Sequence, residues 1–214
     1  MDVISLRRRI NRLIHIHSSS LITDIEQSGF SCACCGWCCC RNFDIRITEN
    51  ILRPSNAISI FPCDIRRIIK MTGCKWDEVA KPDIYSCFSD GSEVKVIGWI
   101  LKRSDEEKCI FYRNDLCTIY SCRPLICRCY PFFMGERGIE IMYCNSLKKI
   151  TQHENAMEIG KNLKLYEIQK LQSYIKIIEQ IGHKLNIDSM KSLPDNYSGN
   201  IIVFDGEMIS KCNI

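Results

Sequence analysis

Six cysteines lie within the nine residues from Cys32 to Cys40. Metal coordination, disulfide formation and a redox function are the roles that readily explain such a density of thiols. Cys32, Cys35 and Cys38 are each three residues apart, so a turn of chain could direct their sulfurs at one centre, about 2.3 Å from each. Gly36 would allow the tight bend at positive φ that this geometry requires. The stretch therefore predicts a metal site.

A second group of cysteines lies between Cys109 and Cys144. Within it, Arg123-Pro124 is predicted to open a single helical turn that Pro131 closes. Cys127 would lie in the first turn of this helix, where free backbone N–H groups and the helix dipole favour a thiolate over a thiol.

The composition argues against a secreted, disulfide-stapled protein. The chain has 16 cysteines in 214 residues and 46 % hydrophobic residues, enough to build a core without cross-links. Residues 13–20 are too polar to complete a signal peptide after the arginines at 7–9. We therefore predict a cytoplasmic protein in a reducing environment. We expect no membrane span, because no stretch approaches about 18 uninterrupted apolar residues.

The formal net charge of +4 counts every cysteine as neutral. Eight thiols ionised on binding metal would add about −8, only partly offset by the metal. A nucleic-acid partner is therefore not expected. Three arginines beside the thiols, Arg41, Arg123 and Arg128, could balance this charge as N–H···S donors, or could be solvated surface residues.

The elements that would position the thiols indicate an α+β fold: a small cysteine-rich metal-binding core of short strands and helices, flanked by an N-terminal helix and a long C-terminal helix. Apolar residues three or four apart predict the helices, and apolar–polar alternation predicts the strands. The strand at 109–112 is expected to pair with 94–101 as a hairpin. The predicted helices are 2–27, 62–71, 76–80 and 150–181, and the predicted strands are 43–47, 94–101, 109–112, 139–143 and 201–204.

These elements divide the chain into four parts. Residues 1–29 are expected to pack as a helix on the core, and residues 30–145 to form the cysteine-cluster metal-binding domain. Residues 146–183 would form the long helix, and residues 184–214 a tail with a short strand. One apolar stripe of the long helix is expected to lie in the core, namely Leu165, Ile168, Leu171, Ile175 and Ile178.

The residues around the cysteines follow one ordered pattern across positions 30–145. They are Phe30, Cys32, Cys35, Gly36, Cys38 and Cys39, then Cys109 and Phe111, then Cys117-Thr118-Ile119-Tyr120, Arg123-Pro124, Cys127-Arg128, Tyr130-Pro131-Phe132 and Cys144. In this pattern the chain resembles the YkgJ-like cysteine-cluster family, which is described as a zinc- or iron-chelating domain.

The resemblance implies a set of eight metal ligands: Cys32, Cys35, Cys38, Cys39, Cys109, Cys117, Cys127 and Cys144. Eight thiolates suit two four-thiolate sites, or one cluster with spare thiols. The chain departs from the pattern by adding further cysteines, and Cys34 or Cys40 could replace a neighbour in the first site. Whether Cys122 or Cys129 replaces a motif cysteine stays open. The other additions, Cys63, Cys74 and Cys87, are expected to be small buried side chains, and Cys212 a bystander.

Zinc and iron both suit all-thiolate sites. Adjacent side chains tend to diverge, so Cys38 and Cys39 are easier to satisfy if each serves a different metal or a different iron of a cluster. An iron–sulfur cluster is therefore slightly favoured over zinc.

The leading prediction is a metal-binding protein whose thiolates hold zinc or iron for structure, storage, delivery or electron transfer, with a protein partner or substrate left open. The alternative is an S-adenosylmethionine-dependent protein lysine N-methylase, because the cysteine core also resembles that of flagellin methylases. Against catalysis, the chain has no Gly-x-Gly pair, and its four histidines lie outside both cysteine regions. A zinc ribbon on nucleic acid is disfavoured by the uneven spacing from Cys39 to Cys109.

Overall fold

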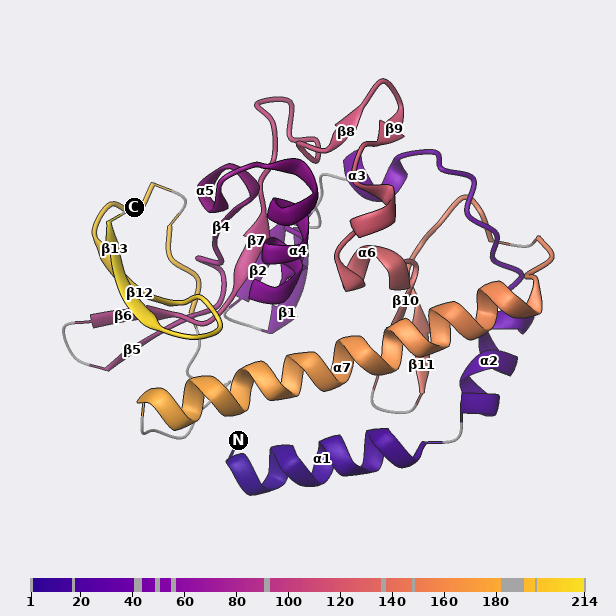
Figure 1. The fold of residues 1–214 in the computed structure, drawn as a ribbon, viewed down its shortest axis with the longest axis horizontal. Coiled ribbons are helices and arrows are strands. Elements are labelled where there is room, and N and C mark those ends of the chain that lie inside the picture. The colour runs from indigo at the N-terminus through magenta and orange to yellow at the C-terminus, as the bar shows by residue number, and fades with distance from the viewer. Residues whose placement is uncertain are drawn as a thin grey trace.

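The computed structural model describes residues 2–16, 18–40, 44–48, 51–54, 57–90, 93–135, 138–147, 149–181, 191–194 and 196–213. It confirms the mixed α+β fold, with a helical N-terminal segment, a cysteine-rich region of short elements and a long helix, α7 (His153–Ile181). In Figure 1, α7 crosses the whole molecule, with α1 along one side of it and the strands and short helices on the other.

The N-terminal segment forms two helices, α1 (Val3–His15) and α2 (Ser18–Gln27), so the prediction of one helix over 2–27 is wrong. The chain leaves the helical conformation at Ile16, whose φ and ψ are −61° and 125°. Lys164 of α7 donates to the carbonyls of Ile14 and Ile16 at 2.8 and 3.1 Å. These bonds stabilise the end of α1, where helical carbonyls lack partners. His17 lies outside the described residues.

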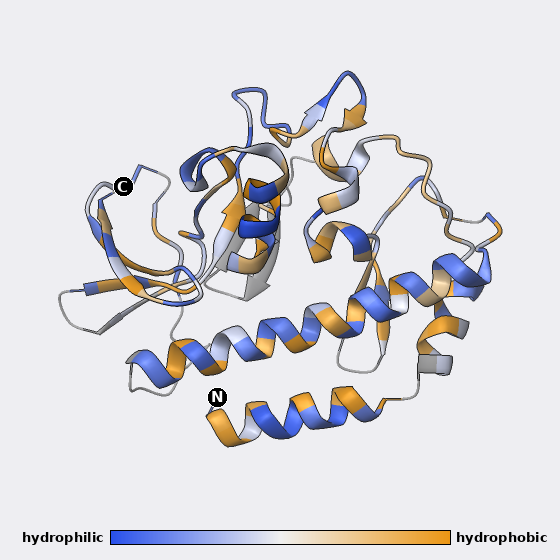
Figure 2. Cartoon of the chain, in the orientation of Figure 1, coloured by the Kyte–Doolittle hydropathy of each residue, from blue (hydrophilic) through white to orange (hydrophobic). Residues whose placement is uncertain are grey.

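The two N-terminal helices pack on different stretches of α7. Leu6 and Leu13 of α1 join Leu171 and Ile175 in one buried cluster. In a second cluster, Ile25 of α2 meets Ile159 and Leu163 of α7, together with Phe30 and Cys129. Figure 2 shows hydrophobic and hydrophilic bands alternating along α1 and α7, as expected of helices with one buried face.

The predicted core stripe of α7 is only partly right. Leu171, Ile175 and Ile178 are buried, but Leu165 is 40 % exposed. Ile159 and Leu163 are buried instead because α2, which the sequence did not separate from α1, covers this part of α7. The predicted stop at Gly182 lies outside the described residues.

The strand predicted over 94–101 is two strands that belong to different sheets. β6 (Glu93–Val96) lies in a four-stranded sheet of order β13-β12-β6-β5, parallel to β12 (Asn200–Phe204), with β13 at Ile209–Asn213 and β5 at Cys87–Asp90. β7 (Trp99–Leu101) is central in a separate sheet, between β3 (Ser59–Ile60) and β4 (Ala80–Pro82). The chain changes sheet at Gly98, whose carbonyl accepts from the Asp83 N–H at 2.9 Å.

The predicted hairpin between 94–101 and 109–112 is also wrong. Just after the predicted strand, Arg103 forms an isolated antiparallel bridge with Cys109. Residue Tyr112 instead begins β8 (Tyr112–Arg113), which pairs with β9 (Leu116–Cys117). β7 has no room for another partner because β3 and β4 occupy both of its edges.

The helices predicted over 62–71 and 76–80 and the strands predicted over 43–47 and 139–143 form close to those bounds, whereas the strands at 51–54 and 132–134 were not predicted. α4 (Pro62–Thr72) has Pro62 in its first turn and ends at Gly73 with φ +73°, as the sequence indicates. The other elements are α5 (Trp76–Val79), β1 (Asp44–Thr48), β2 (Ile51–Pro54), β10 (Phe132–Met134) and β11 (Ile139–Ile141). Among the described helices, none is long and apolar enough to cross a membrane.

Candidate metal centre

The first cysteine region is an extended loop that ends in the short helix α3 (Trp37–Cys40). Ser31 N–H donates to the Ser146 carbonyl at 3.2 Å, and Ala33 N–H to Ser146 Oγ at 3.3 Å. Gly36 bends the loop with φ +70°, which confirms the predicted role of this glycine. A Cβ at this position would also overlap the hydroxyl of Tyr112, so the Tyr112 side chain would have to move if another residue replaced Gly36.

The second cysteine region brings its thiols to the same place by a series of tight turns. Cys109 N–H donates to the Cys39 carbonyl at 2.9 Å, which joins the two regions directly. The β8–β9 hairpin turns at Asn114 and Asp115, with φ of 49° and 60°, and delivers Cys117. Cys127 is then carried by α6 (Leu125–Cys129), as predicted.

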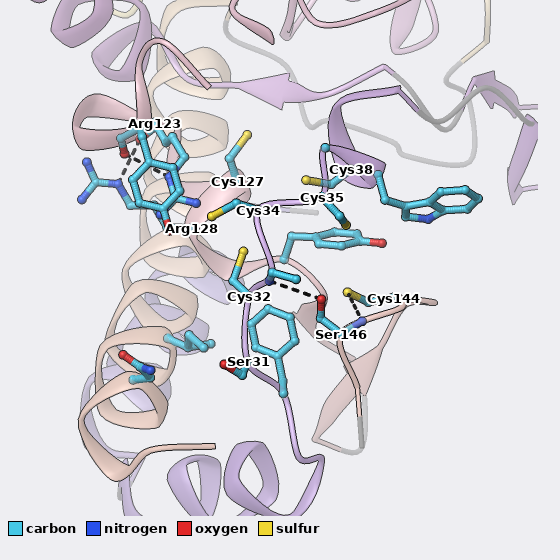
Figure 3. Close-up of a pocket in the computed structure, with 18 of the residues that line it drawn as sticks. Ser31, Cys32, Cys34, Cys35, Cys38, Arg123, Cys127, Arg128, Cys144 and Ser146 are labelled. Atoms are coloured by element: carbon cyan, nitrogen blue, oxygen red, sulfur yellow. Dashed lines mark hydrogen bonds between the residues drawn. The ribbon is translucent and has the colours of Figure 1, made fainter. Parts of the chain in front are cut away.

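Two adjoining cavities flank the cysteine loop. The smaller has a volume of about 260 Å³ and also contacts α7 through Asn155, Glu158 and Asn162. The larger, about 510 Å³, is lined on its other sides mainly by apolar residues such as Ile58, Leu101 and Phe133. Figure 3 shows the smaller cavity, with thiols of the loop, of α6 and of the segment after β11 around it.

The structure brings all eight cysteines of the predicted ligand set to these cavities. Cys32, Cys38 and Cys127 line both, Cys35 and Cys144 line the smaller, and Cys39, Cys109 and Cys117 line the larger. Of the eight other cysteines, Cys34 alone lines them, and it lines both. All sixteen cysteines are described, and none is paired in a disulfide.

The Cys39 and Cys109 thiols share a hydrogen bond that polarises the pair. The bond from Cys39 lowers the pKa of Cys109 to about 7, against the effect of burial. The pKa of Cys39 is raised, first by this bond and then by one with Cys38. Cys109 is therefore the thiol of this pair that ionises first, although it is only 5 % exposed.

Burial keeps two other thiols of the larger cavity protonated. It raises the pKa of Cys117 and raises that of Cys127 well above its ordinary value. The charges of Cys109 and Cys38 act on both thiols in the same direction, which places all four sulfurs within electrostatic reach of one another. The positive charge of Arg123 acts in the opposite direction and offsets part of the increase in both pKa values.

Arg123 and Arg128 donate hydrogen bonds to backbone carbonyls, and their predicted role as N–H···S donors stays a prediction. Arg123 donates to the Tyr120 carbonyl at 3.0 Å, and Arg128 donates to the carbonyls of Arg123 and Ser121, each at 3.0 Å. Their guanidinium groups therefore order the backbone around α6, and Arg123 influences the thiols through its charge. Arg41 lies outside the described residues.

Sequence reasoning missed Arg103, which lies against the Cys39–Cys109 pair. Its Nη2 donates to the Cys39 carbonyl at 2.8 Å. Burial lowers the pKa of its guanidinium, whereas the charges of Cys109 and Cys39 raise it. The sequence signal was weak because the charged run at 102–108 is typical of a solvated turn.

The α6 turn is also tied to α4 by a buried ion pair. Asp64 is 1 % exposed, accepts from the N–H of Leu125 at 3.2 Å, and pairs with Arg67. Arg67 in turn donates to the Arg123 carbonyl at 2.9 Å. Asp64 thus supplies the N-terminal cap that Pro124 does not give to α6.

Replacing Asp64 by alanine is expected to lower the free energy of unfolding of the metal-free protein by about 2–3 kcal/mol, since it leaves buried donors without partners. Denaturant unfolding would measure this loss. Arg66→Gln is the matched control, because Arg66 lies on the same helix but makes surface contacts, with Asp205, Glu207 and the Trp76 ring. The control substitution should lower the free energy of unfolding by less than about 0.5 kcal/mol. Equal losses in both variants would contradict the capping role.

Cys87 represents the thiols that line neither cavity. It is 2 % exposed, its Sγ donates to the Ile84 carbonyl at 3.2 Å, and burial raises its pKa to about 12. Because the thiolate is the reactive form, iodoacetamide should label the exposed Cys34 and Cys35 of the folded, metal-free protein but spare Cys87 until the protein unfolds. Peptide mass spectrometry would detect the labels, and labelling of Cys87 as fast as Cys34 would contradict this assignment.

The donor chemistry of the site fits zinc or iron, because its walls supply thiols and both metals accept all-thiolate coordination. Within the described ranges, no three His, Cys, Asp or Glu side chains are already arranged to hold a metal ion. In Figure 3 the labelled thiols surround the cavity from different directions. Binding would therefore require their sulfurs to turn towards a common point.

A model of the CxxCxxCC family, described as "Putative zinc- or iron-chelating domain", matches residues 31–153, more than half of the chain. The chain belongs to the CxxCxxCC family. This confirms the cysteine-cluster resemblance found in the sequence, and the spacing in the family name corresponds here to Cys32, Cys35, Cys38 and Cys39. No curated protein matches the chain, and no solved structure does either.

The CxxCxxCC match ends at the start of α7. Asn155, Glu158 and Asn162, which α7 contributes to the smaller cavity, lie beyond it. The site of this family member is thus built from the matched region together with a helix that follows it.

Proposed function

We propose that this CxxCxxCC protein chelates zinc or iron through Cys32, Cys35, Cys38, Cys39, Cys109, Cys117, Cys127 and Cys144. One observation carries the proposal. All eight of these cysteines line the two adjoining cavities, whereas seven of the other eight cysteines line neither. The cavities therefore separate the predicted ligands from most of the other cysteines. Cys34 is a ninth thiol available to the centre.

An iron–sulfur cluster is the form of metal that we favour. Cys38 lines both cavities and Cys39 only the larger, so the adjacent thiols face different surroundings. That difference supports the argument that neighbouring sulfurs serve different metal atoms. When bound, such a cluster would supply electron-transfer chemistry, and a zinc ion would supply structural stability.

The setting we infer is the cytoplasm, where thiols stay reduced. The absence of disulfides among the described cysteines supports this inference. Residues 30–145 would form the metal-binding domain, with 1–29, 146–183 and 184–214 as flanking segments. The direct link from Cys109 to Cys39 supports treating the two cysteine regions as one unit.

The test is anaerobic purification followed by metal analysis, acid-labile sulfide analysis and an absorption spectrum. Iron with stoichiometric sulfide and a broad band near about 400 nm would support the cluster. Colourless protein with stoichiometric zinc would support chelation and reject the cluster. Protein that holds neither metal, and that takes up neither when the reduced, metal-free form is supplied with zinc or with ferrous iron and sulfide, would overturn the proposal.

A further inference from the structure

Arg103 has an unusual position between the two cysteine regions. Its Nη2 and Nε both donate to the carbonyl of Glu107, and Nη2 also donates to the Cys39 carbonyl at 2.8 Å. The same Cys39 carbonyl accepts from Cys109 N–H at 2.9 Å. One side chain therefore holds the backbone of the first cysteine region against the start of the second.

The third nitrogen of this guanidinium is not accounted for by the fold. Within the described part of the chain, Arg103 Nη1 is buried and has no hydrogen-bond partner. A buried N–H group without a partner costs about 1–3 kcal/mol, so such groups are rare unless they have a role. The guanidinium lies against the backbone of Cys39, and the charges of Cys39 and Cys109, with those of Cys40 and Glu107, act on it.

Metal binding would change the charge next to Arg103. A thiol becomes a thiolate when it binds a metal, so Cys39 and Cys109 would both be anionic in the loaded centre. Cys109 is nearly inaccessible to water, so solvent can do little to stabilise that charge. A fixed cation at short range can do so, and a guanidinium can also donate hydrogen bonds to the sulfurs.

We infer that Arg103 is the positioning and charge-compensating residue of the metal centre, with Nη1 reserved as a donor to the thiolates of the Cys39–Cys109 pair in the loaded state. The inference rests on the proposed chelation function. It assigns a role to a residue in the charged run that joins β7 to the second cysteine region. It also explains why one nitrogen of a half-buried arginine is left without a partner.

Two substitutions separate the charge from the hydrogen-bond geometry. Arg103→Gln removes the charge, whereas Arg103→Lys keeps the charge but lacks the planar fork that reaches Cys39 and Glu107 together. Arg113→Gln is the matched control. Arg113 is an exposed arginine of the neighbouring β8, and among the described residues it donates to the Ile110 carbonyl at 3.4 Å.

Each protein would be loaded with Zn²⁺ or Co²⁺, and release to a chelator would be followed over time. We expect Arg103→Gln to release metal about 10- to 100-fold faster than the unchanged protein, the range seen for outer-shell partners, and Arg103→Lys to lie between them. The sulfur-to-cobalt charge-transfer band should shift in Arg103→Gln. Arg113→Gln should match the unchanged protein in both measurements.

Thermal unfolding of the loaded and metal-free forms distinguishes this role from simple packing. Substituting a charge-compensating residue should reduce the stabilisation that metal provides. Substituting a residue that acts only by packing would lower the unfolding temperatures of the loaded and metal-free forms equally. Equal lowering, or release from Arg103→Gln at the unchanged rate, would overturn the inference. If the unchanged protein took up no metal, the proposed function itself would fail, which is a separate result.

Discussion

Replacing Cys127 by serine is expected to lower the metal affinity more than about 100-fold. Even the loss of a residue that only hydrogen-bonds to a metal ligand typically lowers metal affinity by about 10- to 100-fold. Cys127 lines both cavities and sits on α6, whose start is fixed by Asp64 and Arg67. A serine hydroxyl is a poor substitute for a thiolate ligand. Metal content after purification and competition against a chelator would measure the loss. Because metal binding and folding are coupled, the variant should also unfold at a lower temperature.

The matched control is Cys129→Ala, on the same short helix. Cys129 lines neither cavity and packs with Ile25, Phe30 and Leu163 in the hydrophobic core. This variant should keep its full metal content and lose only the small packing contribution of a buried sulfur, of order 1 kcal/mol. Full metal content in Cys127→Ser, or equal metal loss in Cys129→Ala, would show that the ligand assignment is wrong.

Metal affinity is expected to rise steeply with pH. In the metal-free protein the pKa values of Cys39, Cys117 and Cys127 are raised, whereas the pKa of Cys109 is about 7. Near pH 7 the first three thiols carry protons and Cys109 is about half ionised. A centre formed by these four thiolates would release about three to four protons, and its apparent binding constant would rise about a thousandfold per pH unit.

Proton release can be counted with a pH indicator in weak buffer as Zn²⁺ is added. Metal affinity rises with pH because protons and metal compete for the same sulfurs, so acid favours the metal-free form. Cys87→Ala is the control, because Cys87 lines neither cavity and should leave the proton count unchanged. Release of one proton or fewer per metal ion would show that these buried thiols are not ligands.

The elements that the sequence predicted well have ends that are encoded locally. α4 begins at Pro62 and ends before Gly73, and α6 lies between Pro124 and Pro131, so nearby residues determine where each helix stops. The glycine bend at Gly36 is of the same kind. The convergence of the cysteine regions could be expected from the family pattern, since the pattern spans both.

The elements that were mispredicted depend on distant partners. β6 pairs with β12, about a hundred residues later in the chain, so local alternation could not separate it from β7. The end of α1 is stabilised by Lys164, about 150 residues later in the chain, and the local periodicity does not reveal this contact. Arg103 was missed for the same reason, because its burial results from contact with Cys39, 64 residues earlier.

The sharing of Cys32, Cys38 and Cys127 between the two cavities limits how the protein can be filled. Of the predicted ligands, the smaller cavity has two sulfurs of its own, Cys35 and Cys144, and the larger has three, Cys39, Cys109 and Cys117. Neither set reaches the four thiolates of a tetrahedral site, so an ion in the smaller cavity would need two of the shared sulfurs and an ion in the larger would need one. The division of the shared sulfurs would therefore decide whether the protein holds one ion or two.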